Sequence, residues 1–169
     1  ETATTVSSEI EQINDIPYHK FTDLSGKTRY YRKGNGNNEY YEYGTPDYSG
    51  VTNAPTIEYV FLKDNAPKNA SWETAIYDLT MAGITVKGKL RFTITDRDFS
   101  RTIGDKSYDN LIEVFTELLI SINGGVSFTT AGFYTTVYAK GIGVVYAETP
   151  KSYPNPNTQW EIKDYFLNP

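Results

Sequence analysis

The chain has 169 residues, with 16 Lys and Arg against 21 Asp and Glu, so its net charge at pH 7 is −5. This length suits one domain with its own hydrophobic core. The negative charge and the lack of a dense basic patch argue against nucleic acid as a partner. Because the sequence contains no cysteine, it also excludes disulfides, thiolate metal sites and cysteine nucleophiles.

The first 17 residues are predicted to form a polar N-terminal tether and lead-in. Small polar residues dominate positions 1–8, as in the tether left after an export signal is removed. Ile10, Ile13 and Ile16 follow at helical spacing, and Pro17 would end a helix there; an irregular lead-in to a strand is the alternative. We expect residues 18–169 to form a single β domain.

Residues 18–63 are predicted to form hairpins. Short loops rich in Gly, Asn, Asp and Ser separate the runs "YHKF", "KTRYYRK" and "EYYEY", which is the turn chemistry of antiparallel neighbours. The run "TIEYVFLK" at 56–63 predicts a further strand. Its aromatic and β-branched side chains are typical of strands.

The clearest strand signal lies at 84–95, where apolar residues occupy even positions and polar residues odd ones. A turn at "KGK" would split this strand in two. Residues 111–122 fit both strand and helix spacing, and the hairpin turn Asn123–Gly124–Gly125 favours the strand. Residues 158–167 suit either an edge strand or a short helix.

These elements together predict the fold class. It is mainly β: a single antiparallel domain built as a sandwich or an open or half barrel, with at most one or two short helices. No apolar run reaches the ~20 residues of a membrane helix, so no membrane-spanning segment is predicted.

The sequence offers little for catalysis or metal binding. Gly141 and Gly143 lie in "KGIG", where strand residues rather than a helix follow, so a bend between strands is favoured over a phosphate loop. His19 is the single histidine. A calcium loop starting at Asp96 would have Arg101 where glycine is required, so we expect a solvated polar loop there instead. We therefore predict no catalytic residues, no metal and no cofactor.

The tyrosines are the candidate binding residues. Five of them fall on two arms of one predicted hairpin, and neighbouring side chains on a strand point to opposite faces. Cross-strand packing would explain the pattern, whereas an exposed row of rings would bind a sugar or a protein surface. The candidates are Tyr30, Tyr31, Tyr40, Tyr41 and Tyr43.

Two stretches within residues 102–148 carry a resemblance. "TIGDKSYDNLIEV" and "YAKGIGVVYAE" resemble a strand and a later hairpin strand in exported, often lipid-anchored proteins of Bacteroidetes with no assigned function. The resemblance implies export, a curved antiparallel sheet and a relation to half-barrel carriers of acyl chains. It supplies no catalytic residues.

We therefore expect a non-enzymatic exported protein of the cell envelope, periplasmic or on the cell surface, with a lipid anchor before Glu1 as one option. Its expected role is a binding module for a glycan or a protein. One alternative is a carrier of an apolar or acyl ligand in a half barrel, with lipid as its partner. A second alternative is a carboxylate-based hydrolase.

Overall fold

A computed structural model describes residues 4–23, 26–35, 38–46, 51–149 and 158–161 of the chain. The described residues contain strands and turns without a helix, and the strands form two open antiparallel sheets. The predicted fold class, mainly β and antiparallel, is therefore confirmed. The chain divides into two compact units, residues 1–65 with 78–85 and residues 66–77 with 86–169.

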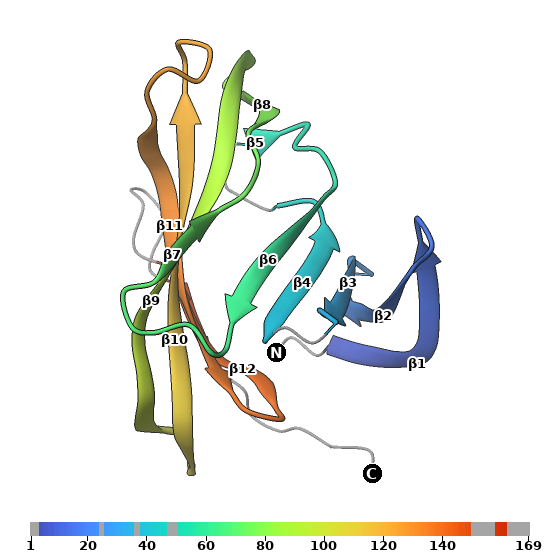
Figure 1. Cartoon of the computed structure of the whole chain (residues 1–169), viewed down its shortest axis with the longest axis vertical. Coiled ribbons are helices and arrows are strands. Elements are labelled where there is room, and N and C mark those ends of the chain that lie inside the picture. The colour runs from blue at the N-terminus through green and yellow to red at the C-terminus, as the bar shows by residue number, and fades with distance from the viewer. Residues whose placement is uncertain (1–3, 24–25, 36–37, 47–50, 150–157, 162–169) are drawn as a thin grey trace. The chain divides into compact units, whose positions relative to one another are not determined.

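The first unit contains an antiparallel meander. Its five-stranded sheet has the order β1-β2-β3-β4-β6, so chain neighbours are sheet neighbours apart from the step over β5 (Figure 1). The strands are β1 (Thr4–Ile13), β2 (Ile16–Asp23), β3 (Thr28–Lys33), β4 (Glu39–Gly44) and β6 (Ile57–Lys63). Strands β5 (Val51–Thr52) and β8 (Tyr77–Met81) pair with each other and belong to the other, eight-stranded sheet. The hairpins predicted over 18–63 are present.

The segment predicted as a tether and lead-in instead contains strand β1, which pairs with β2. The connecting turn is Asn14–Asp15, with φ of 51° and 63°, between the paired residues Ile13 and Ile16. Two consecutive positive φ values match the type I′ turn that favours tight hairpins. The helical spacing of the isoleucines is thus accidental, because the turn reverses the chain between them.

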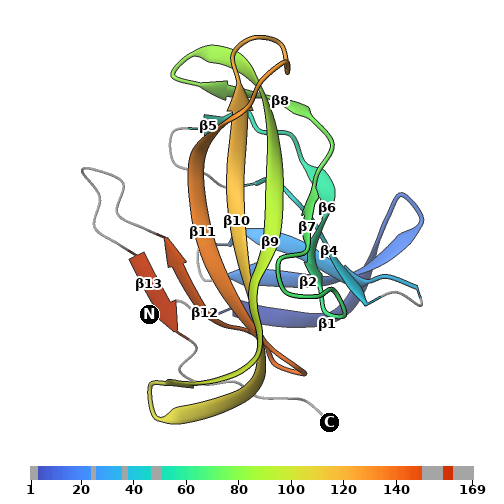
Figure 2. The ribbon, with the colours of Figure 1, turned by 60° about the vertical axis from the view of Figure 1, so that its left-hand side comes forward.

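The second unit is built on long strands. Its sheet runs β13-β12-β11-β10-β9, and β7 also pairs with β9. In Figure 2, β9, β10 and β11 lie side by side. The strands are β7 (Ser71–Glu73), β9 (Ile84–Ile103), β10 (Lys106–Ser121), β11 (Thr129–Ala139), β12 (Gly143–Thr149) and β13 (Thr158–Glu161).

Strand β9 confirms the alternation predicted at 84–95 and shows no break at "KGK". Val86, Leu90, Phe92 and Ile94 are all buried. The strand also continues through the polar stretch from Asp96 that was expected to be a loop. That expectation was wrong because β10 pairs with this stretch and satisfies its backbone hydrogen bonds. Ile103 also lies in a buried cluster, against which Phe99 packs.

Residues 111–121 belong to strand β10, as the hairpin turn after them predicted. Residues 158–161 form strand β13, which supports the edge-strand alternative, and 162–167 lie outside the described residues. The "KGIG" segment is the turn between β11 and β12. The Ile142 amide donates to the Ala139 carbonyl at 3.2 Å, and Gly141 has φ +78°, so a bend between strands is confirmed.

Candidate functional site

The five candidate tyrosines lie on neighbouring strands, β3 and β4, and the pleat divides them between two faces. Tyr30 is opposite Tyr43, whereas Tyr31 is opposite Glu42. All five rings are half-buried. By the alternation of the strands, one face carries Tyr31 and Tyr40, and the other carries Tyr30, Tyr41 and Tyr43.

Tyr31 and Tyr40 belong to an aromatic cluster that also contains two phenylalanines. Tyr31 meets Phe21 edge to face, with ring centroids 4.9 Å apart and planes at 88°. Phe61 lies 5.5 Å from Tyr31 and 6.4 Å from Tyr40. These distances and tilts are the favourable geometry for aromatic pairs. The cluster therefore joins strands β2, β3, β4 and β6 through ring contacts.

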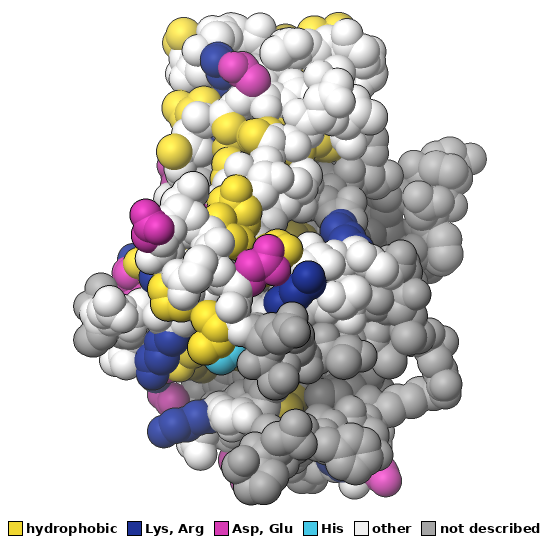
Figure 3. All heavy atoms as spheres, turned by 90° about the vertical axis from the view of Figure 1, so that its right-hand side faces the viewer, with side chains coloured by type: hydrophobic (Ala, Val, Ile, Leu, Met, Phe, Trp, Pro, Cys, Tyr) yellow, Lys and Arg dark blue, Asp and Glu magenta, His cyan; other side chains and the backbone are white. Residues whose placement is uncertain are grey.

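An open hollow of about 240 Å³ lies over this cluster. Figure 3 shows hydrophobic side chains next to histidine and to Lys or Arg side chains on the face that it draws. The hollow is smaller than the ~300–1,000 Å³ of sites that enclose a drug-sized ligand. It suits one flat group of a larger ligand. The lining residues are His19, Phe21, Tyr31, Arg32, Lys33, Tyr40 and Phe61.

A second hollow of about 240 Å³ shares three of these residues, His19, Arg32 and Lys33. We call these three the basic ridge. The second hollow adds Ile10, Pro17 and Tyr18 to the lining. Two adjoining hollows with a common basic ridge could hold two neighbouring groups of one ligand.

Two contacts hold the Tyr40 side chain at the first hollow, one at its hydroxyl and one at its ring. Its hydroxyl donates to Asp64 Oδ2 at 2.8 Å, and the Lys33 ammonium lies 5.3 Å from the centre of its ring. Burial, followed by the hydrogen bond to Asp64, raises the pKa of Tyr40. The phenol therefore keeps the proton that it donates to Asp64, and the ring is held by its own neighbours.

Tyr31 lies beside an ion pair whose carboxylate is buried. Arg29 Nη1 donates to Glu42 Oε1 at 2.7 Å, and Glu42 is only 5% exposed. Burial, with the negative charge of Glu42 next in importance, raises the pKa of Tyr31. The ion pair of Arg29 and Glu42 thus helps to hold the Tyr31 ring, which lies at the centre of the aromatic cluster.

The tyrosines of the opposite face surround Arg32. Its guanidinium carbon is 3.8 Å from the centre of the Tyr41 ring and 5.7 Å from that of Tyr18, and its Nη2 is 2.6 Å from Glu58 Oε1. Tyr43 lies 5.9 Å from Tyr18 and 6.4 Å from Tyr30. These three candidates therefore pack against one another and Arg32, and they do not line either hollow.

The structure adds residues that the sequence analysis did not select. Phe21, Phe61 and Lys33 line the first hollow beside Tyr31 and Tyr40. His19, the single histidine of the sequence, lies opposite Tyr31 across strands β2 and β3. Alternation within "YHKF" puts His19 and Phe21 on one face, which is the signal that could have found them.

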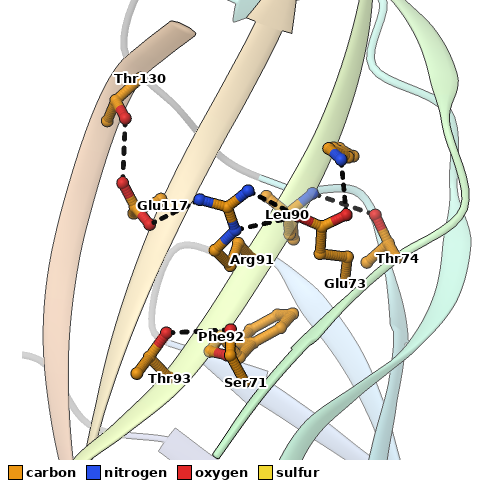
Figure 4. Close-up of polar contacts among 10 residues, drawn as sticks. Ser71, Glu73, Thr74, Leu90, Arg91, Phe92, Thr93, Glu117 and Thr130 are labelled. Carbon is orange, nitrogen blue, oxygen red and sulfur yellow. Dashed lines mark hydrogen bonds and ion pairs between the residues drawn. The ribbon is translucent and has the colours of Figure 1, made fainter. Parts of the chain in front are cut away.

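The second unit has a ladder of charged groups, drawn in Figure 4. Arg91 donates through Nε to Glu73 Oε1 at 2.9 Å and lies 3.8 Å from Glu117, which accepts from the Thr130 hydroxyl at 2.9 Å. Glu73 also accepts from Lys89, and this bond, with burial opposing it, lowers the pKa of Glu73. A general acid needs a raised pKa instead. The ladder therefore serves to tie β7, β9, β10 and β11 together.

Among the described residues, no group of three or more His, Cys, Asp or Glu side chains is arranged to hold a metal ion. The part of the chain that the structure describes also has no helix long and apolar enough to cross a membrane. Comparison with family models, with curated proteins and with solved structures finds no match for this chain.

Proposed function

We propose that the protein is a non-enzymatic binding module that recognises a glycan through the aromatic hollow of its first unit. The observation that carries this proposal is the cluster of Phe21, Tyr31, Tyr40 and Phe61 beside the basic ridge. Aromatic rings offer flat apolar surface to the C–H face of a sugar, and the neighbouring N–H and O–H groups can bond its hydroxyls.

A glycan fits this site better than a protein surface does. Stable protein interfaces spread over a surface of ~1,200–2,000 Å² in total. Each hollow is instead a local concavity of about 240 Å³, which can admit a single ring. A polysaccharide presents single rings one after another, so it can place one ring in a small hollow. This size argument favours the glycan among the predicted ligands.

The proposal includes export to the cell envelope. Its support is the resemblance of residues 102–148 to exported proteins, and a surface glycan is a ligand that such a location supplies. The two alternatives remain predictions. An acyl carrier would require an enclosed apolar space, and a hydrolase would require two carboxylates facing one cleft.

The test is titration calorimetry against a panel of soluble neutral and acidic oligosaccharides. We expect at least one to bind, and the Tyr40→Ala variant to bind it about five- to tenfold more weakly, because one central aromatic contact is worth about 1 kcal/mol or more. Tyr43→Ala is the matched control, since Tyr43 is on the same strand but the opposite face.

Two results would contradict the proposal. One is the absence of binding to every oligosaccharide of the panel at millimolar concentration. The other is an equal loss of affinity in Tyr40→Ala and Tyr43→Ala, which would mean that the substitutions act through the stability of the sheet. Circular dichroism of both variants shows whether they are folded.

A further inference from the structure

We infer that the hollows select an acidic sugar, a uronate or a sulfated residue, and that Lys33 is the residue that recognises its anionic group. This inference rests on the proposed glycan binding. It starts from the charges at the site. The residues that line the two hollows include Lys33, Arg32 and His19 but no Asp or Glu. On a chain with a net charge of −5, this is a local reversal of sign.

The two cations of the basic ridge, Arg32 and Lys33, differ in whether a neighbouring carboxylate compensates their charge. Arg32 is paired with Glu58 at 2.6 Å and has the Tyr41 ring stacked on it, so its charge is compensated within the sheet. Lys33 is exposed at the end of β3 and has no ion-pair partner among the described residues. The charge left for a ligand is therefore that of Lys33.

Lys33 is also placed where a sugar ring would lie. It is opposite Tyr40 across strands β3 and β4, and its ammonium is 5.3 Å from the centre of that ring. A pyranose stacked on the aromatic surface would bring its substituents to the edge of the ring. An anionic substituent at that edge can form a charge-assisted hydrogen bond with the Lys33 ammonium.

Because the two hollows share the basic ridge, they predict where the ligand carries its anionic group. His19, Arg32 and Lys33 line both hollows, so the basic ridge lies between the two. An oligosaccharide that crosses the ridge would place one sugar in each hollow and its anionic group at the ridge. We therefore expect a disaccharide or longer acidic fragment to bind better than the acidic monosaccharide.

The experiment uses matched pairs of ligands on the whole chain. One pair is a trigalacturonate and the same trisaccharide with its carboxyl groups reduced to alcohols, and the other is a sulfated galactan oligosaccharide and its desulfated form. Titration calorimetry measures each Kd at low and high salt. We expect at least one acidic form to bind about fivefold or more tightly than its neutral partner at low salt, and less so at high salt.

Three variants separate the role of Lys33 from a general effect of charge. Lys33→Met keeps the length of the side chain and should weaken binding of the acidic ligand more than binding of its neutral partner, so that the acidic preference is lost, while Lys33→Arg should retain the preference. Lys20→Met is the control, because Lys20 is in the same sheet and does not line either hollow but pairs with Glu11 at 3.6 Å. It should leave the preference intact.

The outcomes are distinguishable from one another. If no ligand of either pair binds while another oligosaccharide of the panel does, this inference fails and glycan binding stands; if nothing in the panel binds, both fail. If the acidic and neutral partners bind equally, glycan binding stands and the acidic selectivity is wrong. If the preference survives in Lys33→Met, or disappears equally in Lys20→Met, the assignment to Lys33 is wrong. The pair that shows the preference identifies the anionic group as carboxylate or sulfate.

Discussion

Replacing Tyr108 by phenylalanine should make the protein more stable. Tyr108 is 6% exposed and belongs to a buried cluster with Leu111, Val137 and Val145, yet its hydroxyl has no hydrogen-bond partner among the described residues. Burying a hydroxyl without a hydrogen bond costs about 1–3 kcal/mol. Phenylalanine removes the oxygen and keeps the ring, and the small void it leaves offsets part of the gain. We expect the free energy of unfolding to rise by about 1 kcal/mol.

Tyr146→Phe is the control. It deletes the same hydroxyl oxygen in the same cluster, but it should lower the free energy of unfolding, whereas Tyr108→Phe should raise it. Tyr146 is 3% exposed, and its hydroxyl donates to Glu148 Oε2 at 2.9 Å. Losing a hydrogen bond to a charged group should lower stability by about 1.5 kcal/mol or more. Urea unfolding measures both changes, and each 1 kcal/mol shifts Tm by about 2–4 °C. A Tyr108→Phe variant less stable than the wild type would refute the reasoning.

Four further substitutions test packing, backbone and charge. Leu118→Ala, at a site 1% exposed, should cost about 2–5 kcal/mol in urea unfolding, whereas Ile122→Ala, at a site 86% exposed, should stay within about 0.5 kcal/mol. Gly141→Ala should cost about 1 kcal/mol at φ +78° although an added Cβ meets no atom within 4 Å; an unchanged Tm would show that the turn adapts. The lowered pKa of Glu73 stabilises the folded state above about pH 4.3, and this stability is lost as the pH falls through the folded pKa. Between pH 6 and pH 3 the free energy of unfolding should therefore fall less steeply in Glu73→Gln than in the wild type. The difference should be under about 1 kcal/mol because the ion pair is at the surface. Identical slopes in the two proteins would contradict this.

The fold class could be predicted because apolar and polar residues alternate along half-buried strands. In β9 the apolar even positions Leu90, Phe92 and Ile94 are the buried ones. The same rule fails at Asp96, Arg97 and Asp98, where the strand continues with charged side chains on both faces. There the partner strand supplies the stabilising contacts, and a partner cannot be recognised from one segment alone. The Asn14–Asp15 turn was a local signal that the spacing of isoleucines concealed.

The candidate site could be predicted in part. Composition and hairpin pattern selected the tyrosines of β3 and β4, and alternation correctly implied that neighbours would separate to two faces. Which face carries the hollow depends on Phe21 and Phe61, which come from β2 and β6 and join the cluster only through the register of the sheet. Register between distant strands is a tertiary property. The sequence therefore identifies the candidate tyrosines but does not show which face of the sheet carries the hollow.

The meander connectivity of both units has a consequence for how fast the chain folds. Along β1-β2-β3-β4 and along β9-β10-β11-β12-β13, each strand pairs with the one that follows it in the chain. Such pairings close short loops, so little chain entropy is lost before contacts form. Hairpins form in about 1–10 μs, and each can begin without waiting for a distant segment. We therefore expect refolding in stopped-flow experiments near the fast end of the range for all-β proteins, with the non-sequential pair of β7 and β9 among the last contacts to form.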